Sequence, residues 1–237
     1  MVITFLITMA LMLSPAVILA DGHNTEPHYQ AGPASQDGIG KFYMGREISH
    51  IMGHLGAGWL ERSTREQEER TDLLVENMNL KPTDVVVDLG AGTGYFSFPM
   101  ARRLTRGKLL AVDIQPEMLT LIQQGKEQLN IDNIQTILAT ETQANIPIGS
   151  ADVVLLVDAY HEFSHPWEVM ESVVKGLKSG GRIVLVEYRG EDRNVPIKRL
   201  HKMTQKQAKK EMQAVGLVWQ QTDNYLPQQH VMIFVKP

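Results

Sequence analysis

The stretch "VVVDLGAGTGYFSF", residues 85–98, carries the strongest structural signal in this chain. It starts with an apolar run, which is typical of a strand buried on both faces of a sheet. Gly90, Gly92 and Gly94 follow at once, and the segment after them is typical of a helix. Glycine accepts backbone angles closed to other residues and lets the main chain approach a ligand closely. The stretch therefore predicts a strand, a tight turn and a helix whose first N–H groups face a ligand.

The chain after Pro82 continues to alternate between strand and helix patterns. Apolar runs predict strands at 84–89, 108–113, 133–139, 151–159 and 182–188. Helical spacing predicts helices at 95–104, 116–130, 166–177 and 205–215. The segments 217–226 and 230–236 predict a terminal antiparallel hairpin. This alternation predicts an α/β sandwich around a mostly parallel sheet, with ligands beyond the carboxyl ends of the strands.

Asp113 ends the second predicted strand, 25 residues after Asp88. A carboxylate at this point accepts hydrogen bonds from both hydroxyls of a ribose. The glycine spacing is G-x-G-x-G, whereas a dinucleotide fingerprint needs a third glycine at position 95, which Tyr95 occupies. The loop and Asp113 therefore predict a ribose-containing ligand and disfavour NAD and FAD.

Four segments in order, "VVVDLGAGTGYFSFPMA", "LLAVDIQPEML", "ADVVLLVDAYHEF" and "LKSGGRIVLVEY", resemble the motifs of class I S-adenosylmethionine-dependent methyltransferases. The resemblance is closest to the domain of ubiquinone/menaquinone-biosynthesis-type enzymes and covers residues 70–237. It implies a Rossmann-like three-layer sandwich with a seven-stranded, mostly parallel sheet in the order 3-2-1-4-5-7-6, strand 7 being antiparallel. It also implies S-adenosylmethionine as the cofactor and in-line methyl transfer to an acceptor, which we expect to be a small molecule.

The resemblance implies cofactor roles at the matching positions of this sequence. Residues of the glycine loop would surround the methionine and ribose portions: Asp88, Gly90, Ala91, Gly92, Gly94 and Tyr95. Asp113 would bind the ribose hydroxyls, Ile114 and Met118 the adenine, and Glu141 or Thr140 the adenine amino group. Asp158 would contact the methionine amine or the acceptor. Packing between helix and sheet is an equal alternative for Tyr95.

The segment "HEFSH", residues 161–165, matches the HExxH pattern of zinc peptidases. That site needs both histidines on one helix, i and i+4. Pro166 follows directly, and the residue before a proline is pushed out of the α region, so we expect a strand-to-helix connection and no metal. In the methyltransferase fold this connection faces the methyl group, which makes His161 and Asp158 candidate catalytic residues, His161 as a general base. A hydrogen bond within the loop is the alternative role for His161. A metalloprotease and a non-catalytic cofactor-binding module remain as alternatives.

Composition restricts the classes of partner. The chain has 237 residues, no cysteine and a net charge of −4. The absence of cysteine excludes disulfides, thiolate metal sites and cysteine nucleophiles. The basic stretch 198–210 contains no stacking aromatic residue, so we expect no nucleic acid partner.

The N-terminal part divides into three segments before the methyltransferase domain, residues 81–237. Residues 1–20 are almost wholly apolar and predict a signal peptide for export, although no Lys or Arg precedes the run. Membrane association through residues 2–20 as an anchor is the alternative. Residues 21–40 are interpreted as a linker and 41–80 as a helical extension. In relatives such an extension commonly closes over the cofactor.

Overall fold

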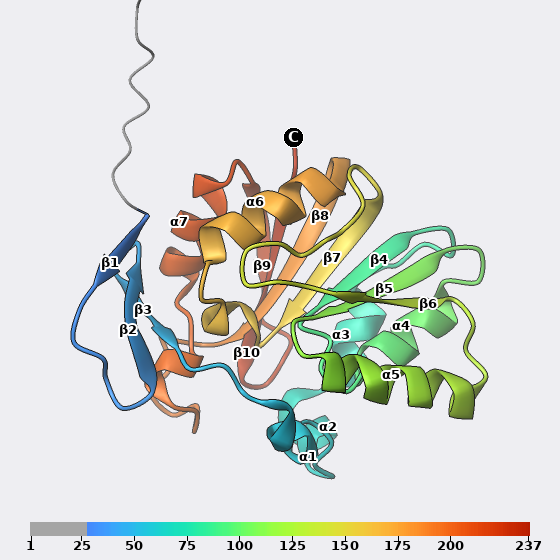
Figure 1. Ribbon diagram of the computed structural model, residues 1–237, viewed down its shortest axis with the longest axis horizontal. Helices are drawn as coiled ribbons and strands as arrows, with labels where there is room; N and C mark the ends of the chain where they lie inside the picture. Colours follow the sequence, from blue (N-terminus) through green and yellow to red (C-terminus); the bar gives the residue numbers. More distant parts are fainter. Residues whose placement is uncertain (1–27) are drawn as a thin grey trace, which may run out of the picture.

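The computed structural model describes residues 28–237, so the predicted signal peptide and the start of the linker lie outside the described residues. A seven-stranded sheet has the order β6-β5-β4-β7-β8-β10-β9 (Figure 1). Its strands are β4 (Val85–Leu89), β5 (Lys108–Asp113), β6 (Ile134–Leu138), β7 (Ala151–Val157), β8 (Leu177–Tyr188), β9 (Val218–Asp223) and β10 (Gln229–Val235). Only β10 and its neighbours pair antiparallel within this sheet. The predicted fold, including strand order 3-2-1-4-5-7-6, is confirmed.

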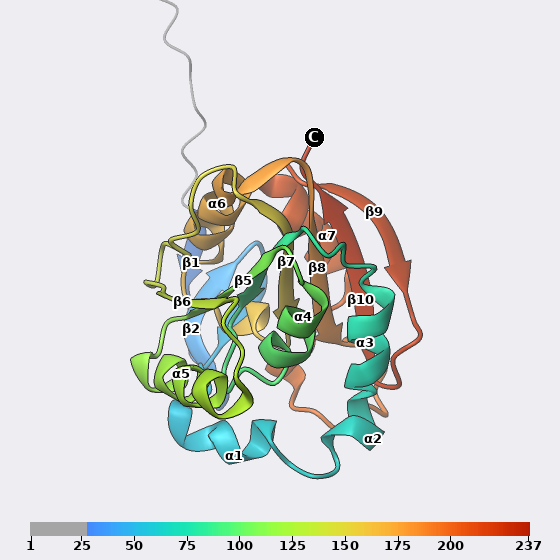
Figure 2. The same ribbon diagram turned by 90° about the vertical axis from the view of Figure 1, so that its right-hand side faces the viewer.

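Helices cover both faces of this sheet (Figures 1 and 2). On one face lie α3 (Thr71–Asn77), α4 (Ser97–Arg103) and α5 (Pro116–Leu129), and on the other α6 (Pro166–Gly176) and α7 (Gln205–Ala214). The central strand β4 contributes to both layers. Val86 packs in the core on the side of α3, α4 and α5, and Val87 packs in the core on the side of α6 and α7. Successive strand side chains point to opposite faces. Each such buried valine stabilises the fold by about 1.5–3 kcal/mol.

One strand is longer than predicted. The sequence places a turn at Ser179-Gly180-Gly181, but β8 already begins at Leu177. Its pairing with β7 is irregular between Ala151 and Val153, and Gly180 has φ +75°. A glycine at such an irregularity lets a strand bend and continue. The glycine pair therefore marks a bend in the strand and not its start.

The N-terminal extension differs from the prediction in its first half. Residues expected to be a linker and a helix form a three-stranded antiparallel sheet of β1 (Tyr29–Ala31), β2 (Gly38–Tyr43) and β3 (Arg46–Ser49). Met44 and Gly45 connect β2 to β3, with φ +50° and +93°. Positive φ at both positions matches a hairpin turn that follows the twist of the strands. The helical prediction holds only farther on, through the short helices η1 (His54–Gly56), α1 (Ala57–Leu60) and α2 (Arg65–Glu69) and then α3.

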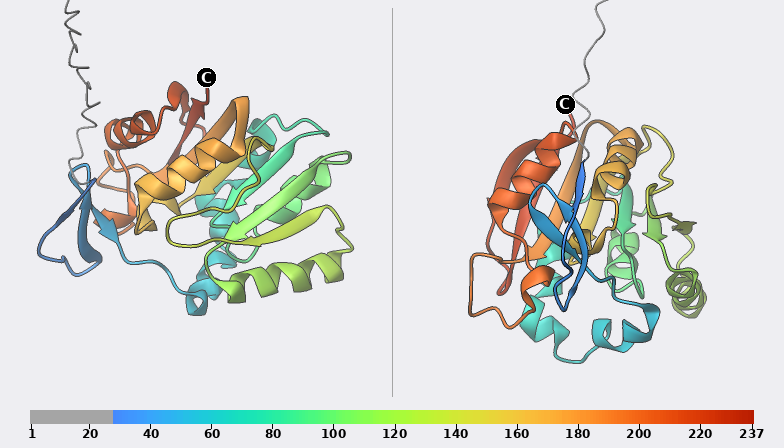
Figure 3. Two further views of the ribbon diagram at one scale, coloured as in Figure 1. Left: turned by 45° about the horizontal axis from the view of Figure 1, so that its top comes forward. Right: turned by 60° about the vertical axis from the view of Figure 1, so that its left-hand side comes forward.

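The small sheet packs beside α6 and α7 (Figure 3). Arg46 of β3 donates to both carboxylate oxygens of Glu211 on α7, at 2.9 and 3.0 Å. Tyr29 of β1 donates to Glu168 on α6. Because Arg46 and Glu211 are buried, the charged groups depend on each other, and removing one partner leaves an uncompensated charge. These contacts hold the small sheet against α6 and α7. From the end of β3 the chain then crosses the carboxyl edge of the large sheet.

Candidate functional site

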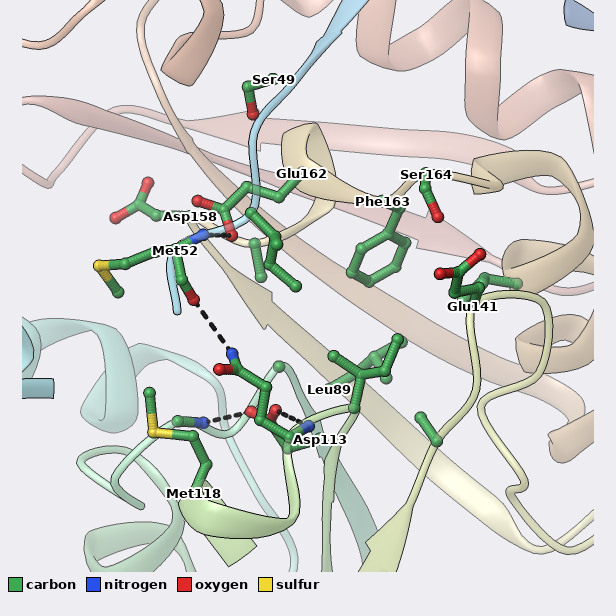
Figure 4. Close-up of a pocket in the computed structure, with 18 of the residues that line it drawn as sticks. Ser49, Met52, Leu89, Asp113, Met118, Glu141, Asp158, Glu162, Phe163 and Ser164 are labelled. Atoms are coloured by element: carbon green, nitrogen blue, oxygen red, sulfur yellow. Dashed lines mark hydrogen bonds between the residues drawn. The ribbon is translucent and has the colours of Figure 1, made fainter. Parts of the chain in front are cut away.

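A pocket of about 310 Å³ lies at the carboxyl ends of β4, β5 and β7 (Figure 4). Its wall combines the glycine turn after β4, the start of α5, the loop after β7 and the segment after β3. Ligands of open α/β sheets bind in this position. The site predicted from the sequence is thus a real cavity.

The glycine turn brings backbone directly to the pocket surface. Gly90 and Gly92 line the pocket and have φ +78° and +53°. A Cβ on Gly90 would lie 2.7 Å from the Cβ of Ala159, and one on Gly92 would lie 2.8 Å from Leu60. The left-handed backbone conformation favours glycine at both positions, and at Gly90 the close approach to Ala159 adds to this requirement, whereas the Leu60 side chain near Gly92 can move.

Asp113, at the end of β5, directs its carboxylate to the same wall. Its two oxygens accept hydrogen bonds from the N–H of Gly92 and of Gln115, each at 2.9 Å. Burial raises the pKa of Asp113, and these N–H groups oppose the shift. A carboxylate offers about four acceptor positions, so about two remain for a ligand. Two free acceptor positions fit the two hydroxyls of a ribose.

Asp158, just after β7, is a strained and incompletely bonded carboxylate in the pocket wall. Its φ of +48° is unusual for a residue other than glycine. Oδ2 accepts from the side-chain amide of Gln229 at 3.0 Å, but buried Oδ1 has no partner among residues 28–237. Burial, with Glu69 and Glu187 nearby, raises the pKa of Asp158 well above its usual range. An unpaired buried acceptor of this kind fits a cationic ligand group such as the α-ammonium of a bound amino acid.

Eight of the residues predicted to bind the cofactor line the pocket: Gly90, Gly92, Asp113, Ile114, Met118, Thr140, Glu141 and Asp158. Ala91 and Gly94 belong to the turn but do not line the pocket. Asp88 lies beneath the turn, where it accepts from Ser97 Oγ at 2.6 Å, and burial raises its pKa to about 6. Tyr95 packs against Arg65, whose guanidinium lies 4.3 Å from the ring centre. Asp88 and Tyr95 therefore support the turn without reaching its ligand side.

His161 lies behind the wall. It belongs to the short helix η2 (Tyr160–Glu162), and only 2% of it is exposed. Its Nδ1 lies 2.7 Å from Glu187 Oε2, and its Nε2 lies 3.1 Å from Nδ1 of His201 in η3 (Arg199–His201). Burial disfavours its charged form, but Glu187 outweighs this effect and raises the pKa of His161. The adjacent Glu162, and not His161, lines the pocket.

The HExxH match has no continuous helix behind it. Phe163 is extended after η2, and α6 starts only at Pro166. His165 stands at the N-cap position without a side-chain cap bond, and its Nδ1 lies 3.0 Å from Ser164 Oγ. The expected strand-to-helix connection is present, although His165 does not cap the helix with its side chain.

The end of β3 and the segment after it, residues 49–53, close one side of the pocket. The N–H of Met52 donates to Glu162 at 3.1 Å, and its carbonyl accepts from Gln115 at 3.0 Å (Figure 4). These two bonds join the loop after β7 to the start of α5 across the pocket. Met52 and its neighbours Ser49, His50 and Ile51, which also line the pocket, follow no local sequence pattern that marks a binding site.

The charged side chains that line the pocket are all acidic. They are Asp113, Glu141, Asp158 and Glu162, and among the described lining residues there is no Lys or Arg. Burial raises the pKa of Glu162. A pocket with this lining favours cationic or neutral ligand groups over anionic ones.

The glycine turn, the carboxylate after β5 and the strand order define a nucleoside-binding α/β protein of the class I methyltransferase type. A family model described as a methyltransferase domain matches residues 80–230, and the chain belongs to this family. S-adenosylmethionine is the cofactor of this class, as the resemblance in sequence implied. The free acceptors of Asp113 and the unpaired oxygen of Asp158 fit its ribose and its α-ammonium.

Relatives and solved structures agree on this class. A methyltransferase-like protein of Schizosaccharomyces pombe is 28% identical, with 49% of this chain and 43% of that protein covered. A demethylmenaquinone methyltransferase of Oceanobacillus iheyensis is 23% identical, with 52% of each chain covered. The chain spans about half the length of these curated relatives. A SAM-dependent methyltransferase of Aquifex aeolicus superposes with a TM-score of 0.74 at 16% identity, covering 79% of this chain and 100% of that one.

Proposed function

We propose that the whole protein is an S-adenosylmethionine-dependent methyltransferase acting on a small-molecule acceptor. The observation that carries the proposal is the pocket wall in which Gly90 and Gly92, the free acceptors of Asp113 and the unpaired oxygen of Asp158 converge. A ligand that joins a nucleoside to an amino acid requires three elements: backbone that can lie close to it, an acceptor for its ribose hydroxyls and an acceptor for its ammonium group. Family membership supports the same activity.

The residues of this chain would bind and orient the cofactor, and they would exclude water from the reacting groups. When bound, S-adenosylmethionine supplies an activated methyl group. Asp113 would hold its ribose, Asp158 its α-ammonium, and Ile114 and Met118 would pack on its adenine. The bonds from Met52 to Glu162 and Gln115 hold the segment over the pocket, which shields the reacting groups from water. Positioning of this kind provides a large share of catalysis when no covalent enzyme intermediate is needed.

The acceptor is proposed to be neutral or cationic. Relatives carry names with different acceptors, among them demethylmenaquinone, phosphoethanolamine and protein L-isoaspartate, and so do not select one. The charge of the pocket restricts the acceptor more than these names do, because its four charged lining residues are carboxylates. A phosphate or carboxylate brought beside Glu141 and Glu162 would meet like charge.

The test is calorimetric titration of the full chain with S-adenosylmethionine, S-adenosylhomocysteine and NAD. We expect the first two ligands to bind one per chain and NAD to remain silent. Release of S-adenosylhomocysteine, measured over phenols, amines and phosphate-bearing compounds, then tests the acceptor class. Folded protein that binds neither methionine ligand would refute the proposal. Binding without turnover across all acceptor classes would instead favour a non-catalytic module.

We also propose that residues 1–20 direct export, with a membrane anchor as the alternative. These residues lie outside the described part of the chain, and the proposal is supported by their apolar sequence. In residues 28–237 no helix has the length and apolar character needed to cross a bilayer. A reporter fused after residue 40 distinguishes the outcomes by its compartment and by whether the apolar run is cleaved.

A further inference from the structure

A cluster of three metal-binding side chains lies directly behind the pocket. His161 and Glu162 come from η2, and His201 comes from η3. Glu162 also belongs to the pocket wall, so the cluster adjoins the cavity. Imidazole and carboxylate are ligands that first-row divalent metals accept, and two imidazoles with one carboxylate recur in catalytic zinc sites.

The spacing of the three ligand atoms fits one metal ion. His161 Nε2 lies 3.1 Å from His201 Nδ1 and 3.8 Å from Glu162 Oε1, and His201 Nδ1 lies 3.7 Å from the same oxygen. Around a tetrahedral ion with bonds of about 2.0–2.1 Å, ligand atoms are about 3.3–3.4 Å apart. The three separations bracket that value, so shifts of a few tenths of an ångström would complete the triangle.

Glu187 prepares His161 for this role. Its fully buried carboxylate accepts from His161 Nδ1 at 2.7 Å, which directs Nε2 toward His201 and Glu162. Metal-binding histidines almost always donate their other ring nitrogen to such a partner. Two carboxylates also flank this place: Glu187 is fully buried, and the side chain of Glu162 is only 14% exposed. A divalent cation compensates both.

We propose that His161, Glu162 and His201 bind a first-row divalent transition metal, with Glu187 orienting His161. The site keeps His161 and Glu162 of the HExxH match and replaces the second histidine of the pattern by His201, which lies 40 residues after His161. This departs from the expectation of no metal, which rested on His165 as the second ligand. His201 is about a quarter exposed, which gives the ion a path from solvent. Binding of the metal does not depend on methyltransferase activity.

The test uses the full, untagged chain after removal of metal by a chelator. Titration with Zn²⁺ by calorimetry, and with Co²⁺ by its visible absorption, should each show one ion per chain, and the cobalt spectrum should be that of tetrahedral or five-coordinate nitrogen–oxygen ligation. Mg²⁺ prefers six oxygen ligands and should not bind at the same concentrations. His201→Ala and Glu162→Gln should each weaken the zinc Kd at least about 100-fold, and Glu187→Gln about 10- to 100-fold.

His165→Ala is the matched control, because the peptidase pattern would make His165 a ligand and the structure does not. Its zinc Kd should stay within about twofold of the unmodified protein. Circular dichroism of each metal-free variant checks that it is folded, and His201→Ala should disturb folding least, because His201 is the most exposed of the three ligands. Zinc that binds the His201 and Glu162 variants as tightly as the unmodified protein, or fails to bind the folded protein at all, overturns the proposal.

Discussion

Asp113→Asn is the substitution that tests the cofactor site most directly. The aspartate carboxylate has about four acceptor positions, of which Gly92 and Gln115 use two. Asparagine removes the charge and turns one oxygen into a donor. One ribose hydroxyl then loses a charge-assisted bond, which is worth about 1.5–3 kcal/mol. The Kd for S-adenosylmethionine should therefore increase about 10- to 150-fold.

The same substitution also affects the free protein, so the assay must separate the two effects. The new amide N–H₂ faces a backbone N–H, which costs about 1–3 kcal/mol of folding free energy. Asp132→Asn removes an equal charge at an exposed position away from the pocket and serves as the matched control. Calorimetry gives the Kd of each variant, and thermal unfolding gives its stability.

A ligand lacking one ribose hydroxyl completes the test. The 2′-deoxy analogue of S-adenosylhomocysteine should bind the unmodified protein more weakly than the parent ligand. In Asp113→Asn this difference should shrink, because part of the lost interaction is already gone. If the Asp113→Asn protein is folded and its Kd is unchanged within twofold, the ribose is not bound by Asp113.

Three further substitutions, one of them with a matched control, test the pocket wall and its support. Asp158→Asn should weaken S-adenosylmethionine binding about 10- to 150-fold through loss of a charged acceptor, yet raise the melting temperature of the ligand-free protein, because burial already raises the pKa of this carboxyl. Equal or lower stability would contradict this expectation. Asp88 has its pKa raised from 3.8 to about 6 by burial, so its stabilising contribution is present below about pH 4 and is lost as the pH rises through about 6. The stability advantage of Asp88→Asn over the unmodified protein in urea should thus grow by about 3 kcal/mol between pH 4 and pH 8, and a constant difference would refute the burial argument. Gly90→Ala should lower the free energy of unfolding by more than the about 1–2 kcal/mol that a left-handed backbone costs a residue with a side chain, because its Cβ would also meet Ala159. Gly180 has φ +75° and open space around it, so Gly180→Ala should lose only the backbone contribution.

The sequence predicted the large sheet well because its signals are local. Buried strands such as 151–157 are apolar apart from Asp152 near the start, and Pro116 and Pro166 mark the starts of α5 and α6. The strand order came from the resemblance, since no local pattern specifies which strands pair. The hairpin at 38–49 was missed because its strands are short and partly exposed, so their alternation of polar and apolar residues is weak. Its turn signal, Met44-Gly45, is not among the commonest hairpin dipeptides.

The neighbourhood of His161 shows what a linear pattern leaves out. The pattern "HEFSH" contains two histidines four residues apart, and Pro166 forbids the helix that would bring them together on one metal. The fold instead brings His201 to 3.1 Å from His161 and places Glu187 on the other side of the same ring. Both partners lie at least 26 residues away along the chain, at separations set by β8 and the segment after it. A local motif can exclude one ligand geometry, but it carries no information on ligands that the tertiary structure supplies from distant parts of the chain. Zinc titration of His165→Ala and of His201→Ala therefore distinguishes the ligand that the linear pattern predicts from the ligand that the fold supplies.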